Sequence, residues 1–399
     1  MKILIVNTFY YPNMVGGTEH SVKILAEGLK KNNNEVFVFT VDNVKGKGIK
    51  VDVENEIKIY RCDGGKFNTE ARLNRKKFIF EKVKNKIVEF NNKYVGNQFL
   101  KVLEEINPDI IHVNNLYGIS PRILKISKEK NIKIVYTIRD YWILDPSVEN
   151  KNRKNLLIKL YQSYFRKYTK YVDYVTAPSK FTLDTLLNNK YFGNSEYLVV
   201  PNCVNINEIE LKKIIDIKNN IDSKIINYIF VGMLEEKKGI LNLLKAFENI
   251  DNENVKLTIC GSGSLEKKIK YYCKKDDRIN YLGQLKKEEL EKEWIKADVC
   301  IVPSVWDEPF GRVVIEANQY GNIVIGSNKG GIKEILDNIK TGIEFQFDDI
   351  EDLKKKILFY TKRENMKKYY KNILENIGTY SQQRQILSFE EIYKKLLIK

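Results

Sequence analysis

Histidine is scarce in this chain, with only two among 399 residues. A metal site built on histidine is therefore not expected. None of the five cysteines forms a C-x-x-C pair. This predicts free thiols in a reducing compartment, the cytoplasm, rather than a disulfide framework. The G-x-G-x-x-G fingerprint is also missing, which argues against a nicotinamide-dependent enzyme.

Long apolar runs are missing as well, since no stretch of about 18 apolar residues occurs. The start of the chain, "MKILIVNTFYYPN", lacks the charged beginning and small-residue cleavage site of a signal peptide. A composition of 43% hydrophobic and 30% charged residues is typical of a soluble globular protein. The length suits two domains of about 200 residues each.

Positive charge is concentrated in the first half of the chain. Residues 1–200 contain 34 Lys and Arg against 21 Asp and Glu, whereas the remainder contains 34 against 31. A coding bias toward lysine would act on both halves alike. The asymmetry therefore favours an anionic partner for the first half, such as a membrane surface or a phosphorylated acceptor.

Short, uniformly apolar runs recur between helix-like stretches. They predict central strands of parallel sheets, buried on both faces. Two successive series predict two doubly wound α/β domains, 1–205 and 206–380, with a C-terminal helix of about 381–399 packing back on the first. The predicted strands are 2–9, 35–42, 109–115, 133–140, 174–179, 197–202, 227–234, 256–263, 279–284, 299–304, 323–328 and 342–347.

The stretch "EPFGRVVIE" sets two carboxylates eight residues apart, Glu308 and Glu316. Pro309 and Gly311 favour a loop or a first helical turn, so we expect Glu308 before a helix and Glu316 one to two turns inside it. The free N–H groups at that helix N-terminus form a natural seat for phosphate.

Two further segments carry residues suited to phosphate. Gly16 and Gly17 lie at the turn from the first strand into a helix, where N–H groups are free for an anion; an ordinary turn is the alternative. Lys237 and Lys238 follow the first strand of the second half, where a lysine can neutralise a diphosphate. A solvated lysine pair remains the alternative there.

Taken in order, five motifs carry a resemblance: "GGTE" after the first strand, Lys238-Gly239, "PS" at 303–304, the 308–316 stretch and "SNKGGIKEIL". Together they resemble the family 4 retaining glycosyltransferases of the GT-B fold, in which two Rossmann-like domains face each other across a cleft. The similarity covers nearly the whole chain and is strongest over 227–347. It implies an acceptor-binding N-terminal domain and a donor-binding C-terminal domain.

The resemblance also implies roles for single residues. Glu308 would lie against the transferred sugar, Glu316 would bind the ribose hydroxyls, and Lys238 would offset the diphosphate charge. No protein nucleophile, metal or other cofactor is required, because the departing phosphate oxygen helps to take the acceptor proton in a front-side attack. The implied catalytic residues are Lys238, Glu308, Arg139 and Asp140, and the implied donor-binding residues are Gly16, Gly17, Gly232, Lys238, Leu282, Glu308, Phe310, Gly311, Arg312, Val313 and Glu316.

The chain departs from the family pattern at two positions. Many members carry arginine where this chain has Met233, and Lys237 or Arg312 is a candidate substitute for that cation. Many carry histidine where Arg139 stands. Arg139 could bind an anionic acceptor or the donor's sugar, with Asp140 beside it; a simple Arg139–Asp140 pair is the alternative.

Segments 72–86 and 151–170 mix Lys and Arg with Phe, Tyr and Leu, as interfacial helices do. The alternative is an ordinary amphipathic helix with a solvated basic face. Nucleic acid is not expected as a partner, because no recognition motif accompanies the charge.

The sequence thus predicts a cytoplasmic glycosyltransferase, at most peripheral at the inner face of a membrane. We expect a UDP-sugar donor, with GDP as the alternative, and a glycan or lipid-linked acceptor. Two other hypotheses remain open at this point: a nucleotide-sugar epimerase of the same fold, which the scarcity of histidine disfavours, and a non-catalytic sugar-nucleotide or glycan-binding subunit.

Overall fold

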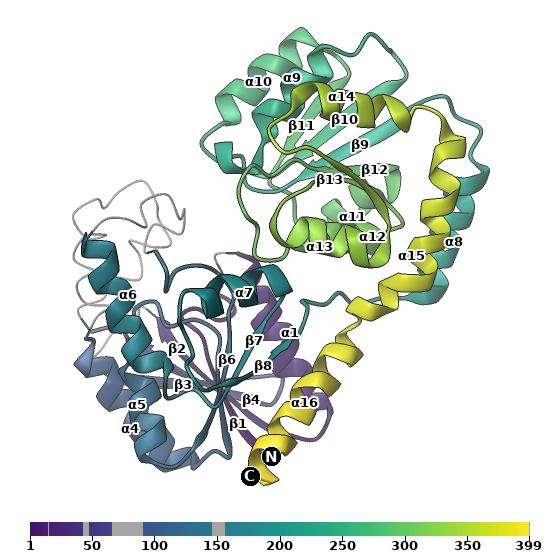
Figure 1. Ribbon diagram of the computed structural model, residues 1–399. Helices are drawn as coiled ribbons and strands as arrows, with labels where there is room; N and C mark the ends of the chain where they lie inside the picture. The colour runs from purple at the N-terminus through teal and green to yellow at the C-terminus, as the bar shows by residue number, and fades with distance from the viewer. Residues whose placement is uncertain (15, 43–47, 66–90, 146–155, 399) are drawn as a thin grey trace. The chain divides into compact units, whose positions relative to one another are not determined.

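The computed structural model describes residues 1–14, 16–42, 48–65, 91–145 and 156–398. The chain divides into two compact units, and each is an α/β domain built on one sheet (Figure 1). The first unit comprises Met1–Pro201 and Gln382–Lys399, and the second comprises Asn202–Ser381. The segment 72–86 and the beginning of 151–170, noted above for a membrane contact, lie outside the described residues.

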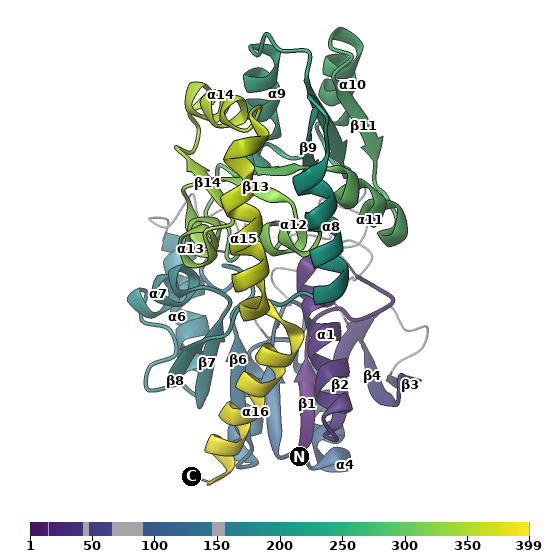
Figure 2. The same cartoon turned by 90° about the vertical axis from the view of Figure 1, so that its right-hand side faces the viewer.

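An eight-stranded sheet forms the centre of the first unit, in the order β3-β4-β2-β1-β5-β6-β7-β8. Helices α1 and α16 pack together on one face, and α4, α5 and α6 form a row on the other (Figures 1 and 2). The elements are β1 (Lys2–Val6), α1 (Gly17–Lys31), β2 (Glu35–Asp42), β3 (Ile49–Glu54), β4 (Ile57–Asp63), α4 (Lys93–Ile106), β5 (Ile110–Val113), α5 (Arg122–Glu129), β6 (Lys133–Thr137), α6 (Leu156–Thr169), β7 (Tyr174–Ala177), α7 (Lys180–Asn188), β8 (Glu196–Val199) and α16 (Gln382–Ile398).

A six-stranded sheet forms the centre of the second unit, in the order β11-β10-β9-β12-β13-β14, and all of its pairs are parallel. The elements are α8 (Glu208–Asn220), β9 (Ile226–Val231), η1 (Glu236–Lys238), α9 (Ile240–Glu248), β10 (Val255–Cys260), α10 (Glu266–Lys275), β11 (Ile279–Gly283), α11 (Lys287–Lys296), β12 (Val299–Val302), α12 (Arg312–Gln319), β13 (Ile323–Ser327), α13 (Gly330–Ile339), β14 (Gly342–Phe345), α14 (Ile350–Phe359), η2 (Arg363–Met366), α15 (Lys367–Asn376) and η3 (Ile377–Tyr380).

The predicted fold class is confirmed, and a strand lies in each of the twelve predicted runs. Two further strands, β3 and β4, lie outside the predicted runs, and β3 runs antiparallel to β4 at one edge of the first sheet. Every residue of β3 is half-buried or exposed, so this edge strand lacks the uniform apolar signal of the central strands.

The five cysteines are all free, as the sequence predicts, and four of them are buried. Burial raises the pKa of the Cys260 thiol to about 12, with a small further rise from Glu293. Burial raises the pKa of Cys62 to about 12 in the same way. These thiols are inert parts of the cores rather than nucleophiles.

Each sheet has one topological switch point, where the strand order reverses direction. It lies between β1 and β5 in the first unit and between β9 and β12 in the second. Ligands of open parallel sheets bind beyond the carboxyl ends of the strands at such points. The loops that follow these four strands are therefore the places to look for a site.

Candidate active site

The loop after β12 leads into α12 through a position that only glycine can fill. Gly311 has a φ of 89°, and a Cβ there would lie 2.6 Å from Cγ1 of Ile332. The helix begins at the next residue. Glu308 thus precedes the helix and Glu316 lies one turn inside it, as the sequence predicts.

Glu308 is a buried carboxylate with a cation against it. Its Oε1 accepts from Nζ of Lys238 at 2.5 Å and from the Ser304 hydroxyl at 2.7 Å. Burial alone would raise the pKa of Glu308, but Lys238, with help from Ser304 and Trp306, outweighs burial and holds this pKa below its usual value. The carboxylate is therefore ionised at neutral pH, which lets it accept hydrogen bonds from sugar hydroxyls.

Trp306 lies beside the same lysine. The centroid of its ring is 5.7 Å from Nζ of Lys238 and 5.5 Å from Nζ of Lys237, both within the range of cation–π attraction. Lys237 forms its ion pair with Glu235, at 3.0 Å. Nζ of Lys238 thus contacts both Glu308 and the indole of Trp306, two residues of the loop that follows β12.

Glu316 is half-buried and paired along its own helix. Its Oε1 accepts from Nε of Arg312 at 2.6 Å. The two candidate substitutes for the family cation at Met233 are therefore both engaged, Lys237 with Glu235 and Arg312 with Glu316. The pairing orients the Glu316 carboxylate, whose second oxygen has further acceptor capacity.

The beginning of α13 packs against the loop between β12 and α12. Gly331 N–H donates to the Glu308 carbonyl at 2.8 Å, and a Cβ on Gly331 would lie 2.5 Å from Cα of Phe310. Gly330 has a φ of 55°, and a Cβ there would meet the Glu308 carbonyl oxygen at 2.6 Å. Nζ of Lys329 donates to the Val305 carbonyl at 3.0 Å. The motif "SNKGGIKEIL" thus has a structural role, in supporting the loop that carries Glu308, which its sequence alone did not indicate.

The far end of α12 is also fixed. The buried Lys218 of α8 donates to the carbonyl oxygens of Ala297 and Tyr320, at 2.5 and 2.9 Å, and to Oδ1 of Asn322 at 2.8 Å. Ala297 and Tyr320 are the C-caps of α11 and α12, where a cation is favourable. Burial lowers the pKa of Lys218 to about 7, so its three hydrogen bonds, rather than a full charge, anchor the helix that carries Glu316.

The other predicted donor residues of the second unit lie at the same sheet edge. Gly232 follows β9, and a Cβ on Gly261 would lie 1.9 Å from its carbonyl oxygen, so the two loops pack backbone to backbone. Leu282 is half-buried at the end of β11. Phe310 is buried, and the centroid of its ring lies 5.8 Å from that of Tyr380. Val313 is half-buried in the first turn of α12.

In the first unit, Gly16 precedes α1 and Gly17 begins it. The N–H of Gly16 is not free, since it donates to Oε2 of Glu19 at 2.9 Å. The expectation of an open N–H at Gly16 is therefore corrected: a carboxylate of the same helix already holds it. Gly16 has an extended backbone with open space around its Cα, so neither packing nor φ requires glycine there.

Arg139 and Asp140 follow β6, and each binds a different asparagine. Nε and one terminal nitrogen of the buried Arg139 donate to Oδ1 of Asn114, at 3.0 and 2.8 Å. Asp140 accepts from Nδ2 of Asn115 at 3.2 Å and from the N–H of Trp142 at 2.9 Å. Each side chain is thus anchored to an asparagine that follows the neighbouring strand β5.

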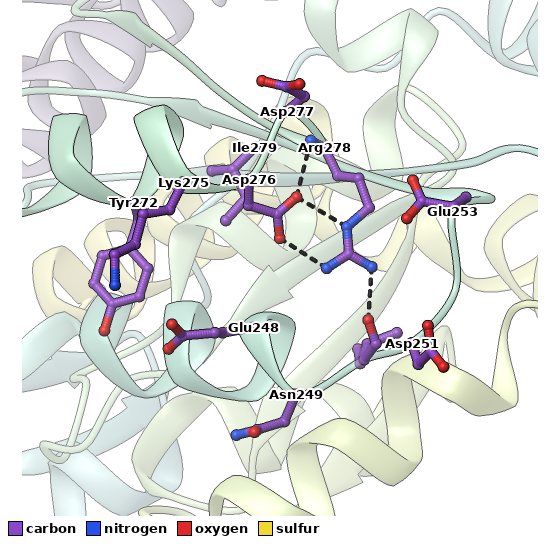
Figure 3. A pocket seen from close by; sticks show the side chains of 11 residues that line it. Glu248, Asn249, Asp251, Glu253, Tyr272, Lys275, Asp276, Asp277, Arg278 and Ile279 are labelled. Atoms are coloured by element: carbon purple, nitrogen blue, oxygen red, sulfur yellow. Dashed lines mark hydrogen bonds and ion pairs between the residues drawn. The ribbon is translucent and has the colours of Figure 1, made fainter.

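A pocket of about 650 Å³ lies at the opposite edge of the second sheet, beside the amino ends of β10 and β11 (Figure 3). Arg278 occupies its wall, paired with Asp276 at 2.7 Å and donating to the carbonyl oxygens of Ile250 and Asn252. These contacts join the end of α9 to the start of β11. The pocket is thus a structural junction, away from the edge where ligands of such sheets bind.

No cluster of His, Cys, Asp or Glu suited to a metal ion occurs within the described ranges. Among those same residues, no helix is long and apolar enough to span a bilayer.

Comparison with solved structures places this architecture among glycosyltransferases. Sucrose-phosphate synthase from Thermosynechococcus elongatus superposes with a TM-score of 0.78 at 19% identity, covering 99% of both chains. HepE from Anabaena, solved with UDP and glucose, superposes with a TM-score of 0.69 at 15% identity, again covering 99% of both. At these identities the likeness shows the fold, which is GT-B, as predicted.

Sequence relatives agree. A Klebsiella pneumoniae protein described as uncharacterized and in the cps region is 28% identical, over 88% of this chain and 91% of that protein. An uncharacterized glycosyltransferase of Methanocaldococcus jannaschii is 26% identical, over 86% and 84%. Residues 15–208 match the family described as Glycosyltransferase Family 4, and residues 212–377 match Glycosyl transferases group 1. The chain therefore belongs to the family 4, group 1 glycosyltransferases, and it is a glycosyltransferase of the GT-B fold.

Proposed function

We propose that the enzyme transfers a hexose-type sugar from a nucleotide sugar, with UDP as the expected carrier and GDP as the alternative, and retains the anomeric configuration. The observation that carries the proposal is the Lys238–Glu308 pair, set beside the N-terminus of α12. It combines an ionised carboxylate for a sugar with a cation and backbone N–H groups for a diphosphate. Solved GT-B neighbours bound to UDP and to UDP-glucose support this donor class.

The chemistry follows from the charge that develops at the leaving group. When the bond between the anomeric carbon and the phosphate oxygen breaks, the bonding pair stays on the diphosphate, which becomes more negative. Lys238 and the N–H groups of the first turn of α12 stabilise that charge. The acceptor oxygen bonds to the anomeric carbon on the same face, and its proton passes to the departing phosphate oxygen. These residues need no covalent step of their own.

Ribose binding is assigned to Glu316. A carboxylate held by Arg312 at 2.6 Å is preoriented, so that it can accept from neighbouring hydroxyls at a small entropic cost. Leu282 and the backbone around it are proposed for the base, and Gly17 and Gly232 for the diphosphate; Gly16 is left out because Glu19 already holds its N–H. Arg139 and Asp140 are proposed to meet the sugar or the acceptor.

The acceptor is proposed to be a glycan or lipid-linked glycan in the synthesis of a polysaccharide or glycoconjugate. The relatives in a cps region and the basic first half of the chain support this assignment. We place the enzyme in the cytoplasm, where free thiols are stable, with a peripheral membrane contact.

A panel of nucleotide sugars tests the proposal. A transferase slowly releases the nucleotide even to water, an epimerase returns an altered nucleotide sugar, and a binding subunit yields neither product. Calorimetry then tests the site: Glu316→Ala should weaken binding of the donor that the panel identifies. Unchanged donor affinity in that variant would contradict the ribose assignment.

A further inference from the structure

Helix α6 (Leu156–Thr169) presents apolar side chains to solvent. Leu156 is 71% exposed and Leu160 is 59% exposed. At 100° per residue these leucines fall on one side of the helix axis together with several exposed polar residues. This outward face of α6 consists of Leu156, Lys159, Leu160, Ser163, Lys167 and, just beyond the helix end, Lys170.

The other side of α6 is fixed by contacts with its own unit. The Tyr161 hydroxyl donates to the Trp142 carbonyl at 2.9 Å, and Gln162 donates to the Leu144 carbonyl at 3.0 Å. The Phe165 ring lies 4.9 Å from that of Trp142. These contacts determine the rotation of the helix, so exposure of the leucines follows from the packing of their neighbours.

Charge on this segment has one sign. Residues 150–172 contain seven Lys and Arg and no Asp or Glu. Arg166 is used within the unit, where it donates to the Asn189 carbonyl at 3.2 Å. In the described part of the chain, neither Lys159 nor Lys167 forms an ion pair with a carboxylate. The outward face is therefore both apolar and uncompensated in charge.

Helix α8 shows that exposed apolar residues alone do not make such a face. Ile209 and Ile217 are 72% and 67% exposed, but the three acids Glu208, Glu210 and Asp216 outnumber the exposed lysines Lys212 and Lys213 beside them. These acids would oppose an anionic surface. The two helices thus form a natural comparison within one chain.

We propose that the outward face of α6 docks on an anionic lipid bilayer. Leu156 and Leu160 enter the interfacial region, while Lys159, Lys167 and Lys170 contact lipid phosphates, their aliphatic stems lying along the surface. Charge complementarity favours this partner over a second copy of the chain, because two such faces would repel each other. The surface deepens the proposed function by locating its membrane contact, but it does not rest on the donor chemistry.

Flotation of the full chain with vesicles tests this assignment. We expect binding to vesicles of equal parts phosphatidylcholine and phosphatidylglycerol, little binding to phosphatidylcholine alone, and weakening as salt screens the charges. Replacing Lys159, Lys167 and Lys170 by Gln should lower the partition coefficient by about fivefold per lysine, or roughly a hundredfold together. Replacing Leu156 and Leu160 by Ser should lower it by roughly tenfold.

Ile209→Ser/Ile217→Ser on α8 is the matched control, and it should bind vesicles as the natural protein does. Thermal melting should be unchanged in all these variants, because every altered side chain is exposed. Equal binding to both vesicle types, no binding to either, or full binding by the lysine variant would overturn the proposal, as would self-association that the leucine variant abolishes. Nucleotide release from the donor without vesicles should be unchanged, so a failure here is distinguishable from a failure of the proposed transfer.

Discussion

Lys238→Met removes the cation from the buried Glu308 while keeping a side chain of similar length. Loss of one partner from a fully buried ion pair costs about 3–5 kcal/mol. Lys238 retains 21% exposure and the Ser304 hydroxyl still donates to Glu308, so we expect a loss of about 2 kcal/mol. For a domain of this size that lowers the melting temperature by roughly 4–8 °C.

The pH dependence of this loss has a definite sign. In the natural protein the folded-state pKa of Glu308 lies below 4.5, so its stabilising contribution is present above pH 4.5 and is lost as pH falls through the folded pKa. Without Lys238, burial raises that pKa, and the ionised carboxylate destabilises the fold at neutral pH. The deficit of the variant should therefore be largest near pH 7 and shrink as pH approaches 4.5.

Differential scanning calorimetry at several pH values measures this effect. Adding Glu308→Gln to the lysine variant removes the unpaired charge, and most of the lost stability should return. Lys237→Met is the control, since its pair with Glu235 is partly exposed and contributes about 0.5 kcal/mol. A Lys238→Met protein that melts like the natural one, or a double variant that recovers nothing, would refute the argument that Lys238 neutralises a buried carboxylate.

Three further changes have defined outcomes. Gly331→Ala places a Cβ 2.5 Å from Cα of Phe310, so it should lower the free energy of unfolding by about 1–3 kcal/mol and weaken donor binding measured by calorimetry. Gly378→Ala is the control, because a Cβ there lies in open space and should change neither quantity. Burial, with Arg139 nearby, holds the pKa of His112 well below 6.5. The unfolded chain therefore takes up a proton below pH 6.5 that the folded chain does not, and the melting temperature should decrease as the pH is lowered from 6.5. Met233→Arg adds a cation after β9 and should tighten UDP binding several-fold by calorimetry, the more so at low salt; unchanged affinity would show that this position does not face the diphosphate.

The central strands could be predicted because parallel strands buried on both faces are apolar at every position. The β3–β4 pair could not, because its exposed residues break that signal with charges. The glycine before α12 and its two flanking glutamates were recognisable because loop and helix signals adjoin in one short stretch. The helix start predicted from this stretch is therefore the one that the structure has.

The partners of those residues depend on distant parts of the chain. Nothing near Glu308 in sequence reveals Gly331, or that Lys238 lies 2.5 Å away, since both follow from the order of strands in the sheet. The hydrogen bond from Gly16 to Glu19 could have been predicted from the sequence, because a capping residue followed three positions later by glutamate is a helix-start signal. The glycine pair was interpreted as a phosphate site because the carboxylate of Glu19 was not considered.

Helix α16 has a consequence for the order in which this polypeptide acquires its structure. Ile386, Phe389, Ile392 and Tyr393 complete the interior against α1 and the sheet of the first unit, although nearly two hundred residues separate them from Pro201. On the ribosome, the unit that is synthesised first therefore lacks part of its interior until α16 has been translated. The second unit is contiguous and can mature earlier, so loss of α16 would leave the interior of the first unit incomplete while sparing the second.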